Sequence, residues 1–276
     1  MSSYAFASCD SLTEANFPLC TSIGSSAFMS CVHLTTISFP SCTSIGNYGF
    51  TYCKDLTVVS FPSCTSIGSY AFYFCSGLTT ISAPLCTFIG GYAFASCINL
   101  TAASFSLCTS IHNNAFVSCS RLTTISFPSC TYIGSYAFAS CDSLTTASFS
   151  CCESIGQYVF AYCSNLTMAN FPVCKSITSY AFFNCSRLSW VDFSVCSIIY
   201  GLFAFGNCQN LLSLYLMSTS VCILSNSSAF YSTPIAGYTA STDGVYGSIF
   251  VPASLLTAYQ TANNWSYYSE RFVGVE

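Results

Sequence analysis

Charged residues are scarce in this chain of 276 residues. Only 5% are Asp, Glu, Lys or Arg, against about 25% in a typical soluble domain. Five Lys and Arg against nine Asp and Glu give a formal net charge of −4. A surface that binds nucleic acid needs clustered positive charge to meet the phosphates. The composition therefore excludes a nucleic-acid-binding protein.

Long apolar runs are also missing, although the mean hydropathy is +0.59. A membrane-spanning helix needs about 18 or more consecutive apolar residues. The uncharged span between Asp192 and Asp243 comes nearest, but polar residues such as Asn207 and Asn210 interrupt it. We therefore expect no transmembrane segment. Intrinsic disorder is excluded as well, because 53% of the residues are hydrophobic and 17% aromatic.

Residue patterns that carry catalysis or hold metals do not occur. The sequence has no C-x₂-C pair, no G-x-S-x-G, no H-E-x-x-H and no phosphate-binding glycine loop. Its only histidines, His33 and His112, are three to four repeats apart and read as solvated loop residues. Asp10 and Asp142 are too far apart in the sequence to act as paired carboxylates. We predict that the protein is not an enzyme and binds neither a cofactor nor a metal.

What the sequence does contain is an internal repeat of 22 residues. Nine phenylalanines keep that spacing, from Phe6 to Phe182, and Phe205 and Phe230 mark less regular copies. Cysteine is equally regular, with 18 residues from Cys9 to Cys196, one every 11 positions. Such a strict period is typical of a solenoid, in which each coil packs on the next. Stacking buries one continuous core, which explains an apolar chain without a membrane segment.

One repeat shows what each position is expected to do. In Leu34-Thr35-Thr36-Ile37-Ser38-Phe39, the alternation places Ile37 inward and Thr36 and Ser38 outward on a strand. Pro40 should end that strand, and Gly46 suits a tight turn with positive φ. Repeating the strand predicts a parallel sheet with neighbours about 4.8 Å apart.

The 21 cysteines could be disulfide-bonded, metal-binding or reduced. Equivalent residues on stacked coils would lie within bridging distance, but ladder side chains point in parallel, which gives a poor torsion for a disulfide. We expect small, buried, reduced thiols, because free cysteine is among the most buried residue types. A protein with many reduced cysteines is typical of a reducing cytosol or an anaerobic habitat.

The repeat resembles the leucine-rich repeat of the BspA-like family. The shared pattern appears here as Ala71-Phe72, Cys75, Leu78-Thr79, Ile81 and Ile89-Gly90, and again in nearly every other copy. The resemblance implies a leucine-rich repeat solenoid with a parallel β-sheet on one face and short helical turns and loops on the other. It also implies a bacterial-type adhesion or recognition module, at the cell surface or secreted, that binds a protein or a cell-surface glycan.

Two segments make up the expected domain organisation. Residues 1–230 form the solenoid of about ten units, and residues 231–276 form a small C-terminal strand-helix cap. In the cap, Gly247–Val251 reads as one last strand that Pro252 ends, followed by an amphipathic helix through Leu255, Leu256 and Tyr259. Ser3-Tyr4-Ala5-Phe6 is already mid-repeat, with no signal peptide before it. We expect either truncation of a longer protein or a partner on this edge.

The outward strand positions suggest where a partner would bind. From Thr36 and Ser38 onward they carry mostly Thr, Ser and Ala, but the C-terminal end changes to Met168, Asn170, Trp190, Asp192 and Tyr215. Exposed Trp and Tyr beside a carboxylate and an amide are typical of an interaction hot spot. The alternative is that Trp190 packs against Met168 or the cap. We predict that these five residues form the binding surface.

Other interpretations of the repeat remain open. Tyr4, Tyr48, Tyr70, Tyr92, Tyr136, Tyr158 and Tyr180 recur two residues before each Phe, and we expect these rings to stack on one another along the flank, although tyrosines can also stack on sugars. A structural role is the main functional alternative, with end-to-end self-association through the uncapped N-terminal edge. An ice-binding surface is a lesser one, because Thr-x-Ser recurs as a regular array.

Overall fold

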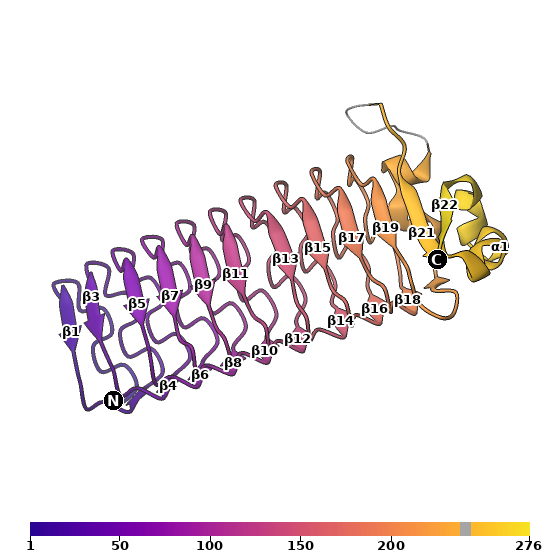
Figure 1. The fold of residues 1–276 in the computed structure, drawn as a ribbon. Helices are drawn as coiled ribbons and strands as arrows, with labels where there is room; N and C mark the ends of the chain where they lie inside the picture. Colours follow the sequence, from indigo (N-terminus) through magenta and orange to yellow (C-terminus); the bar gives the residue numbers. More distant parts are fainter. Residues whose placement is uncertain (238–243) are drawn as a thin grey trace. The chain divides into compact units, whose positions relative to one another are not determined.

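The computed structural model describes residues 1–237 and 244–276. They divide into two compact units, Met1–Leu144 (unit 1) and Thr145–Glu276 (unit 2). Each unit is a parallel β-solenoid, built from coils that each contribute a three-residue strand and a two-residue strand (Figure 1). The predicted fold class is confirmed. The described part of the chain has no helix long and apolar enough to cross a membrane.

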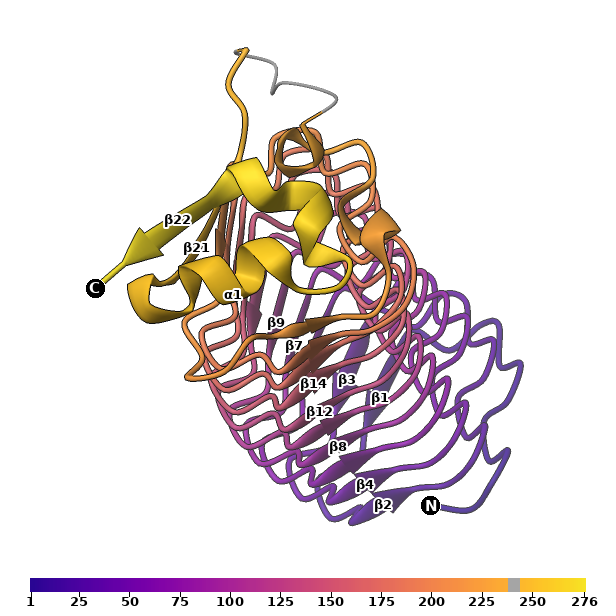
Figure 2. The same cartoon turned by 90° about the vertical axis from the view of Figure 1, so that its right-hand side faces the viewer.

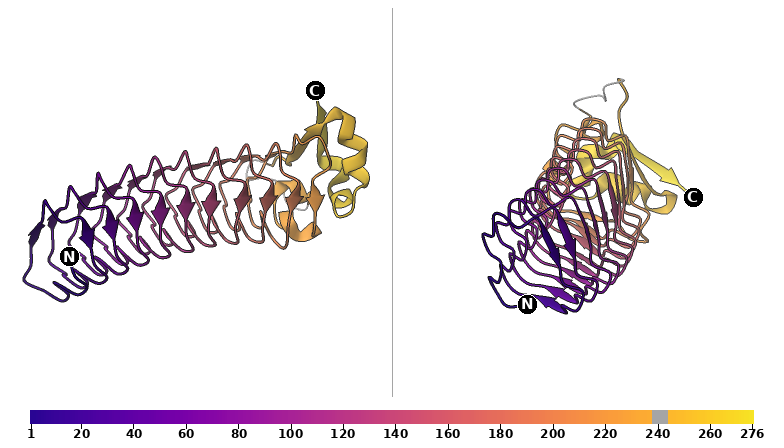
Figure 3. Two further views of the ribbon diagram at one scale, coloured as in Figure 1. Left: turned by 90° about the horizontal axis from the view of Figure 1, so that it is seen from below. Right: turned by 90° about the vertical axis from the view of Figure 1, so that its left-hand side faces the viewer.

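Unit 1 holds two rows of parallel strands. The three-residue strands are β1 (Glu14–Asn16), β3 (Thr36–Ser38), β5 (Val58–Ser60), β7 (Thr80–Ser82), β9 (Ala102–Ser104) and β11 (Thr124–Ser126). The two-residue strands are β2 (Ser22–Ile23), β4 (Ser44–Ile45), β6 (Ser66–Ile67), β8 (Phe88–Ile89), β10 (Ser110–Ile111) and β12 (Tyr132–Ile133). The sequence predicted the first row, whereas turns and loops were expected where the second row lies. Successive coils of this unit lie one behind another (Figure 3, right).

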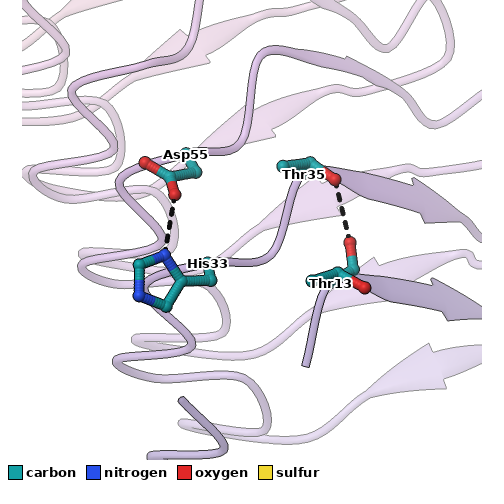
Figure 4. Close-up of polar contacts among 4 residues, drawn as sticks. All are labelled: Thr13, His33, Thr35 and Asp55. Carbon is teal, nitrogen blue, oxygen red and sulfur yellow. Dashed lines mark hydrogen bonds and ion pairs between the residues drawn. The ribbon is translucent and has the colours of Figure 1, made fainter. Parts of the chain in front are cut away.

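The sequence period sets the pairing register. Glu14 pairs with Thr36 and Val58 with Thr80, each 22 residues further along. Threonine side chains reinforce the stacking, because a hydroxyl on one coil donates to a carbonyl of the preceding coil. Thr35 Oγ1 donates to Thr13 O at 3.0 Å in this way (Figure 4). Each coil thus satisfies polar groups of its neighbour.

Several coils carry a glycine just before the turn, as Gly24, Gly46, Gly68 and Gly90 do, and its role differs from the expected one. Gly46 is not in the left-handed region, so the expected positive φ is wrong. A Cβ on Gly46 would instead lie 2.7 Å from Ser25 N, in the preceding coil. Close approach of neighbouring coils therefore excludes a side chain here. The positive φ falls on Tyr48 (φ 60°) and Tyr52 (φ 63°), and most coils carry two such residues.

Phenylalanine forms the centre of the core in both units. Phe50, Phe72 and Phe94 are fully buried, and each ring stacks on the next at 5.2 Å between centroids. Phe182 and Phe205 do the same in unit 2 at 5.3 Å. Because burial of apolar surface drives folding at about 25 cal/mol per Å², these ladders contribute to the stability of both units.

The cysteines are free thiols in the structure, and most are buried. Buried thiols in successive coils donate hydrogen bonds to backbone carbonyls, as Cys97 Sγ does to Phe72 O at 3.1 Å and Cys108 Sγ to Ser110 O at 3.4 Å. Cysteine therefore supplies both a small apolar volume and a hydrogen-bond donor, in the case of Cys97 a second donor to the Phe72 carbonyl, which also accepts from Cys75 N at 3.2 Å. Burial raises the pKa of Cys97 to about 12 and that of Cys108 to about 11, which keeps both thiols protonated.

Unit 2 is built from coils of the same kind and adds the C-terminal elements. Its longer strands are β13 (Thr146–Ser148), β15 (Met168–Asn170), β17 (Trp190–Asp192), β19 (Ser213–Tyr215), β21 (Ser248–Pro252) and β22 (Phe272–Val275), in this order in one parallel sheet. Its two-residue strands are β14 (Ser154–Ile155), β16 (Ser176–Ile177), β18 (Ile198–Ile199) and β20 (Ile223–Leu224). The helices are η1 (Ser227–Phe230), η2 (Pro234–Ala236), η3 (Ala253–Leu255), α1 (Leu256–Thr261) and η4 (Trp265–Arg271). In Figure 2, α1 and β22 lie across the last coil.

The C-terminal elements differ from the expected cap in two respects. β21 ends at Pro252, as expected, but β22 adds a second strand. The α-helix has only six residues, and Tyr259 is the one that it buries. Tyr259 Oη accepts from Cys222 N at 2.9 Å, and Trp265 Nε1 donates to Cys222 O at 2.6 Å. Two buried aromatic residues therefore anchor the end of the chain to the coil that contains Cys222.

Candidate functional site

The five predicted site residues lie on three adjacent strands of unit 2. Register pairs Met168 with Trp190, and pairs Asn170 with Asp192 and Asp192 with Tyr215. The middle residue of each strand is buried, as Val191 is, so the flanking side chains lie on the opposite face of the sheet. Met168 is 45% exposed and the other four are half-buried.

The aromatic side chains of this face are in contact. Trp190 and Tyr215 lie 6.0 Å apart between ring centroids, inclined at 47°. Tyr215 stacks on Phe250 of β21 at 4.5 Å and 12°. We call the face formed by Met168, Trp190, Tyr215 and Phe250 the aromatic sheet face.

Phe250 is a member of this face that the sequence analysis missed. Ser248-Ile249-Phe250 repeats the outward–inward–outward pattern of Ser213-Leu214-Tyr215, and the two strands pair in register. That alternation is the sequence pattern from which the outward position of Phe250 could have been predicted. The period does not reveal it, because Ser248 follows Ser213 by far more than 22 residues.

Asp192 has a local structural task in addition to its place on the face. Its Oδ1 accepts a hydrogen bond from the backbone N–H of Ser194 at 3.0 Å and another from the Ser194 hydroxyl. These bonds close the turn after β17, as Asp side chains commonly do. Asp192 therefore fixes the chain beside Trp190 and holds the strand end in position.

The corresponding face of unit 1 has a hollow that the sequence analysis did not predict. A cavity of about 270 Å³ lies over β5, β7, β9 and β11. Ala102 and Ala103 at its centre are smaller than Thr80 and Ile81 on the neighbouring strand, and Val58 at its rim is 58% exposed. Ala102 was visible in the sequence, but it was interpreted as part of a uniform Thr/Ser/Ala surface.

The two histidines have different neighbours. His33 Nδ1 lies 3.0 Å from Asp55 Oδ2, on an adjacent coil, and both side chains are exposed (Figure 4). His112 packs against the Phe88 ring at 4.6 Å. The interpretation as solvated loop residues omitted both contacts. Exposed pairs of this kind contribute about 0–1 kcal/mol, so neither is a strong structural feature.

The tyrosine ladder stacks as expected where its neighbours lie within one unit. Tyr48 and Tyr70 lie 4.9 Å apart, Tyr70 and Tyr92 4.7 Å, and Tyr158 and Tyr180 4.5 Å, all within 7° of parallel. The two rings of each pair face one another, which is the stacking that the sequence analysis expected.

Comparison with known proteins identifies the repeat. The family model of the BspA type leucine-rich repeat region, which spans six copies, matches residues 1–107, 43–167, 87–211 and 148–250. No curated protein matches the chain.

Several solved structures are similar. A leucine-rich repeat protein of T. pallidum is 26% identical over 52% of this chain and 70% of its own, with a TM-score of 0.49. One from Bacteroides ovatus is 23% identical over 100% of this chain and 88% of its own, with a TM-score of 0.46. A leucine-rich cell surface protein of Faecalibacterium prausnitzii is 25% identical over 76% and 74%, with a TM-score of 0.38.

Proposed function

Because the chain belongs to the BspA-type leucine-rich repeat family, we propose that it is a binding module that uses the aromatic sheet face of unit 2 to hold a protein partner. Proteins with such repeats typically act as non-enzymatic scaffolds, and members of this family are cell-surface proteins. The proposed location is accordingly the cell surface or the secreted fraction. Residues 1–230 are the proposed binding solenoid and residues 231–276 its cap.

The contiguous row of rings Trp190, Tyr215 and Phe250 carries this proposal. Aromatic residues are enriched in protein interfaces, where they give large rigid contact area at low entropic cost. Met168 extends the row with a flexible apolar side chain, which suits an adaptable contact. Asn170 and Asp192 supply polar groups at the rim.

Substitution of Trp190 tests the proposal. Trp190→Ala and Tyr215→Ala should each weaken binding by about 2 kcal/mol, or about 30-fold, if these side chains are central to the interface. The measurement is surface plasmon resonance against a panel of purified extracellular matrix proteins. Thr124→Ala, on the sheet face of unit 1, is the matched control and should bind as the unmodified protein does.

Thermal unfolding separates a binding role from a packing role. Trp190→Ala should leave the melting temperature nearly unchanged, since the side chain is only half-buried. A drop of many degrees together with unchanged binding would assign Trp190 to packing against Met168 and Tyr215. Unchanged binding in both variants would refute the proposal for this face.

A further inference from the structure

Six aromatic side chains gather on the flank of unit 1. We call the group Tyr48, Tyr52, Tyr70, Tyr73, Phe74 and Tyr92 the unit 1 platform. Tyr73 lies nearly perpendicular to Tyr70 at 5.5 Å and to Tyr52 at 5.6 Å. Phe74 lies 5.6 Å from Tyr52 and 5.5 Å from Tyr73. Because Tyr48 and Tyr92 cover both faces of Tyr70, only its edge remains for Tyr73.

The platform is open to solvent. Tyr48 and Phe74 are each 41% exposed and Tyr52 is 38% exposed, while Tyr70, Tyr73 and Tyr92 are half-buried. Contiguous exposed aromatic surface on a soluble protein commonly marks an interaction site.

Unit 2 carries a similar arrangement, in which four of the six rings correspond to those of unit 1. Its platform consists of Tyr158, Tyr162, Tyr180, Phe183, Phe203 and Tyr231. Tyr180 meets Phe183 at 5.4 Å and 74°, and Tyr162 meets Phe183 at 5.7 Å and 81°. Tyr158, Tyr162, Tyr180 and Phe183 follow Tyr48, Tyr52, Tyr70 and Tyr73 by five periods of 22 residues. The platform is therefore a recurring feature of the chain.

The coils do not need these extra rings in order to fold. Ala95 and Ser96 stand at the positions of Tyr73 and Phe74 in the next coil. Ala95 N donates to Tyr92 O at 3.2 Å, just as Tyr73 N donates to Tyr70 O at 3.1 Å. The backbone is thus the same with small side chains, so packing of the coil does not explain the aromatic ones.

The backbone conformation also indicates that packing of the coil does not explain these aromatic residues. Tyr52, Phe74 and Tyr162 adopt φ of 63°, 58° and 64°, in the left-handed region that bulky residues rarely occupy. Ser96 and Ser118 fill the equivalent position with φ of 60°. Aromatic residues at strained positions, with their side chains exposed, are typical of functional surfaces.

We propose that the two platforms bind a neutral glycan, whose pyranose rings stack on the exposed tyrosines. A tyrosine offers a flat apolar surface with a hydroxyl at its rim, which matches the C–H faces and hydroxyls of a sugar. None of the twelve platform residues is charged. A neutral ligand therefore binds without removing water from a charge on either side.

The neighbouring charges do not favour a charged ligand. Lys54 and Asp55 are the charged residues nearest to Tyr52 in the sequence, and they have opposite signs. Asp55 is paired with His33 at 3.0 Å. This inference does not rest on the aromatic sheet face.

Affinity electrophoresis in native gels tests the inference. The gels contain a neutral polysaccharide, in turn a β-glucan, a mannan, a galactan and a xylan. The unmodified protein should be retarded by at least one of them. Tyr52→Ser/Tyr73→Ala/Phe74→Ser and Tyr162→Ser/Phe183→Ala should each weaken that retardation about 30-fold, the loss expected when central aromatic contacts are removed. These substitutions introduce residues that other coils already carry at the same positions.

Leu107→Ser is the matched control. Leu107 is 47% exposed, and Ser63 and Ser129 occupy its position in other coils. This variant should be retarded like the unmodified protein, and the melting temperatures of all variants should agree. Trp190→Ala should also be retarded normally, so this experiment and the test of the sheet face can fail separately.

Three results would overturn the inference. The first is that no neutral polysaccharide retards the protein. The second is that the platform variants are retarded as strongly as the unmodified protein. The third is self-association by analytical ultracentrifugation that the platform variants abolish, without any glycan effect, because the platforms would then bind a second copy of the chain.

Discussion

Unit 1 and unit 2 are built on the same kind of core but carry different residues on their sheet faces. Phe72 and Phe182, five periods apart, are both fully buried in stacked ladders. On the sheet face, Thr80 of unit 1 stands where unit 2 has Trp190, and Ser82 where unit 2 has Asp192. Inward positions must fit the neighbouring coil, whereas outward positions are free to vary. Recognition can therefore differ along a chain whose packing stays constant.

Alkaline pH should have the largest effect on stability, and it should lower the free energy of unfolding of both units. Burial raises the pKa of Cys97 in unit 1 to about 12 and that of Cys152 in unit 2 to about 11, from 9.0 for an exposed thiol. Thiols in the unfolded chain ionise first, so the unfolded state binds fewer protons above pH 9. The stabilisation is complete below pH 9 and is lost as the pH rises toward the folded values, by about 1.4 kcal/mol per thiol and pH unit.

Urea unfolding at a series of pH values measures this loss. Circular dichroism reports on the whole chain, and tryptophan fluorescence reports on unit 2, which contains both Trp190 and Trp265. Between pH 7 and about 8 the midpoint should stay constant, and toward about pH 10.5 it should fall steeply by both probes. A constant midpoint would contradict the protective burial of the thiols. A fall by one probe alone would show that the two cores differ.

Truncation of one phenylalanine in the ladder should have the next largest effect on stability. Phe72→Ala and Phe182→Ala should each lower the free energy of unfolding by about 3–5 kcal/mol, because both leave a cavity in a tightly packed core. The free energies of unfolding of the two variants are measured by urea denaturation, followed by circular dichroism and by tryptophan fluorescence. Thr124→Ala, at an exposed position, should change stability by about 0.5 kcal/mol or less. A Phe72→Ala cost near zero would refute the equivalence of the two cores.

Exchange of sheet-face residues should have the smallest effect on stability. Thr80→Trp/Ser82→Asp, which copies the unit 2 residues into unit 1, should change the free energy of unfolding by about 0.5 kcal/mol or less. Trp190→Thr/Asp192→Ser should cost about 1 kcal/mol, because it removes the bonds from Asp192 to Ser194. Chemical denaturation checks both values. A loss of several kcal/mol in either variant would mean that the outward positions also determine folding.

The sequence allowed the fold to be predicted because burial in this chain follows a fixed period. The spacing of Phe28, Phe50 and Phe72 gave the ladder, and alternation gave the outward position of Trp190. The place of Phe250 on the aromatic sheet face was not predicted, because the long segment after Tyr215 interrupts the period. The place of Tyr73 and Phe74 in the unit 1 platform was not predicted for another reason. Both lie in turns, where alternation does not indicate which side chains reach the solvent.

One wrong expectation, for Gly46, and one omission, for Cys97, have a common physical origin. The role of Gly46 and the donor role of Cys97 both depend on the backbone of another coil, at 2.7 Å from Ser25 N and 3.1 Å from Phe72 O. Sequence patterns describe a residue within its own coil. Contacts between coils, which decide these two cases, depend on how closely the coils stack.

The uniform spacing of these contacts has an evolutionary consequence. Thr79 Oγ1 donates to Thr57 O at 2.9 Å, and Thr101 Oγ1 donates to Thr79 O at 3.1 Å, so neighbouring coils present interchangeable surfaces. Recombination that removes or duplicates one whole coil would therefore rejoin matching surfaces and leave the backbone pairing intact. A gene of this kind can change the length of its product in steps of one coil, and can move an aromatic platform along the chain without designing a new core.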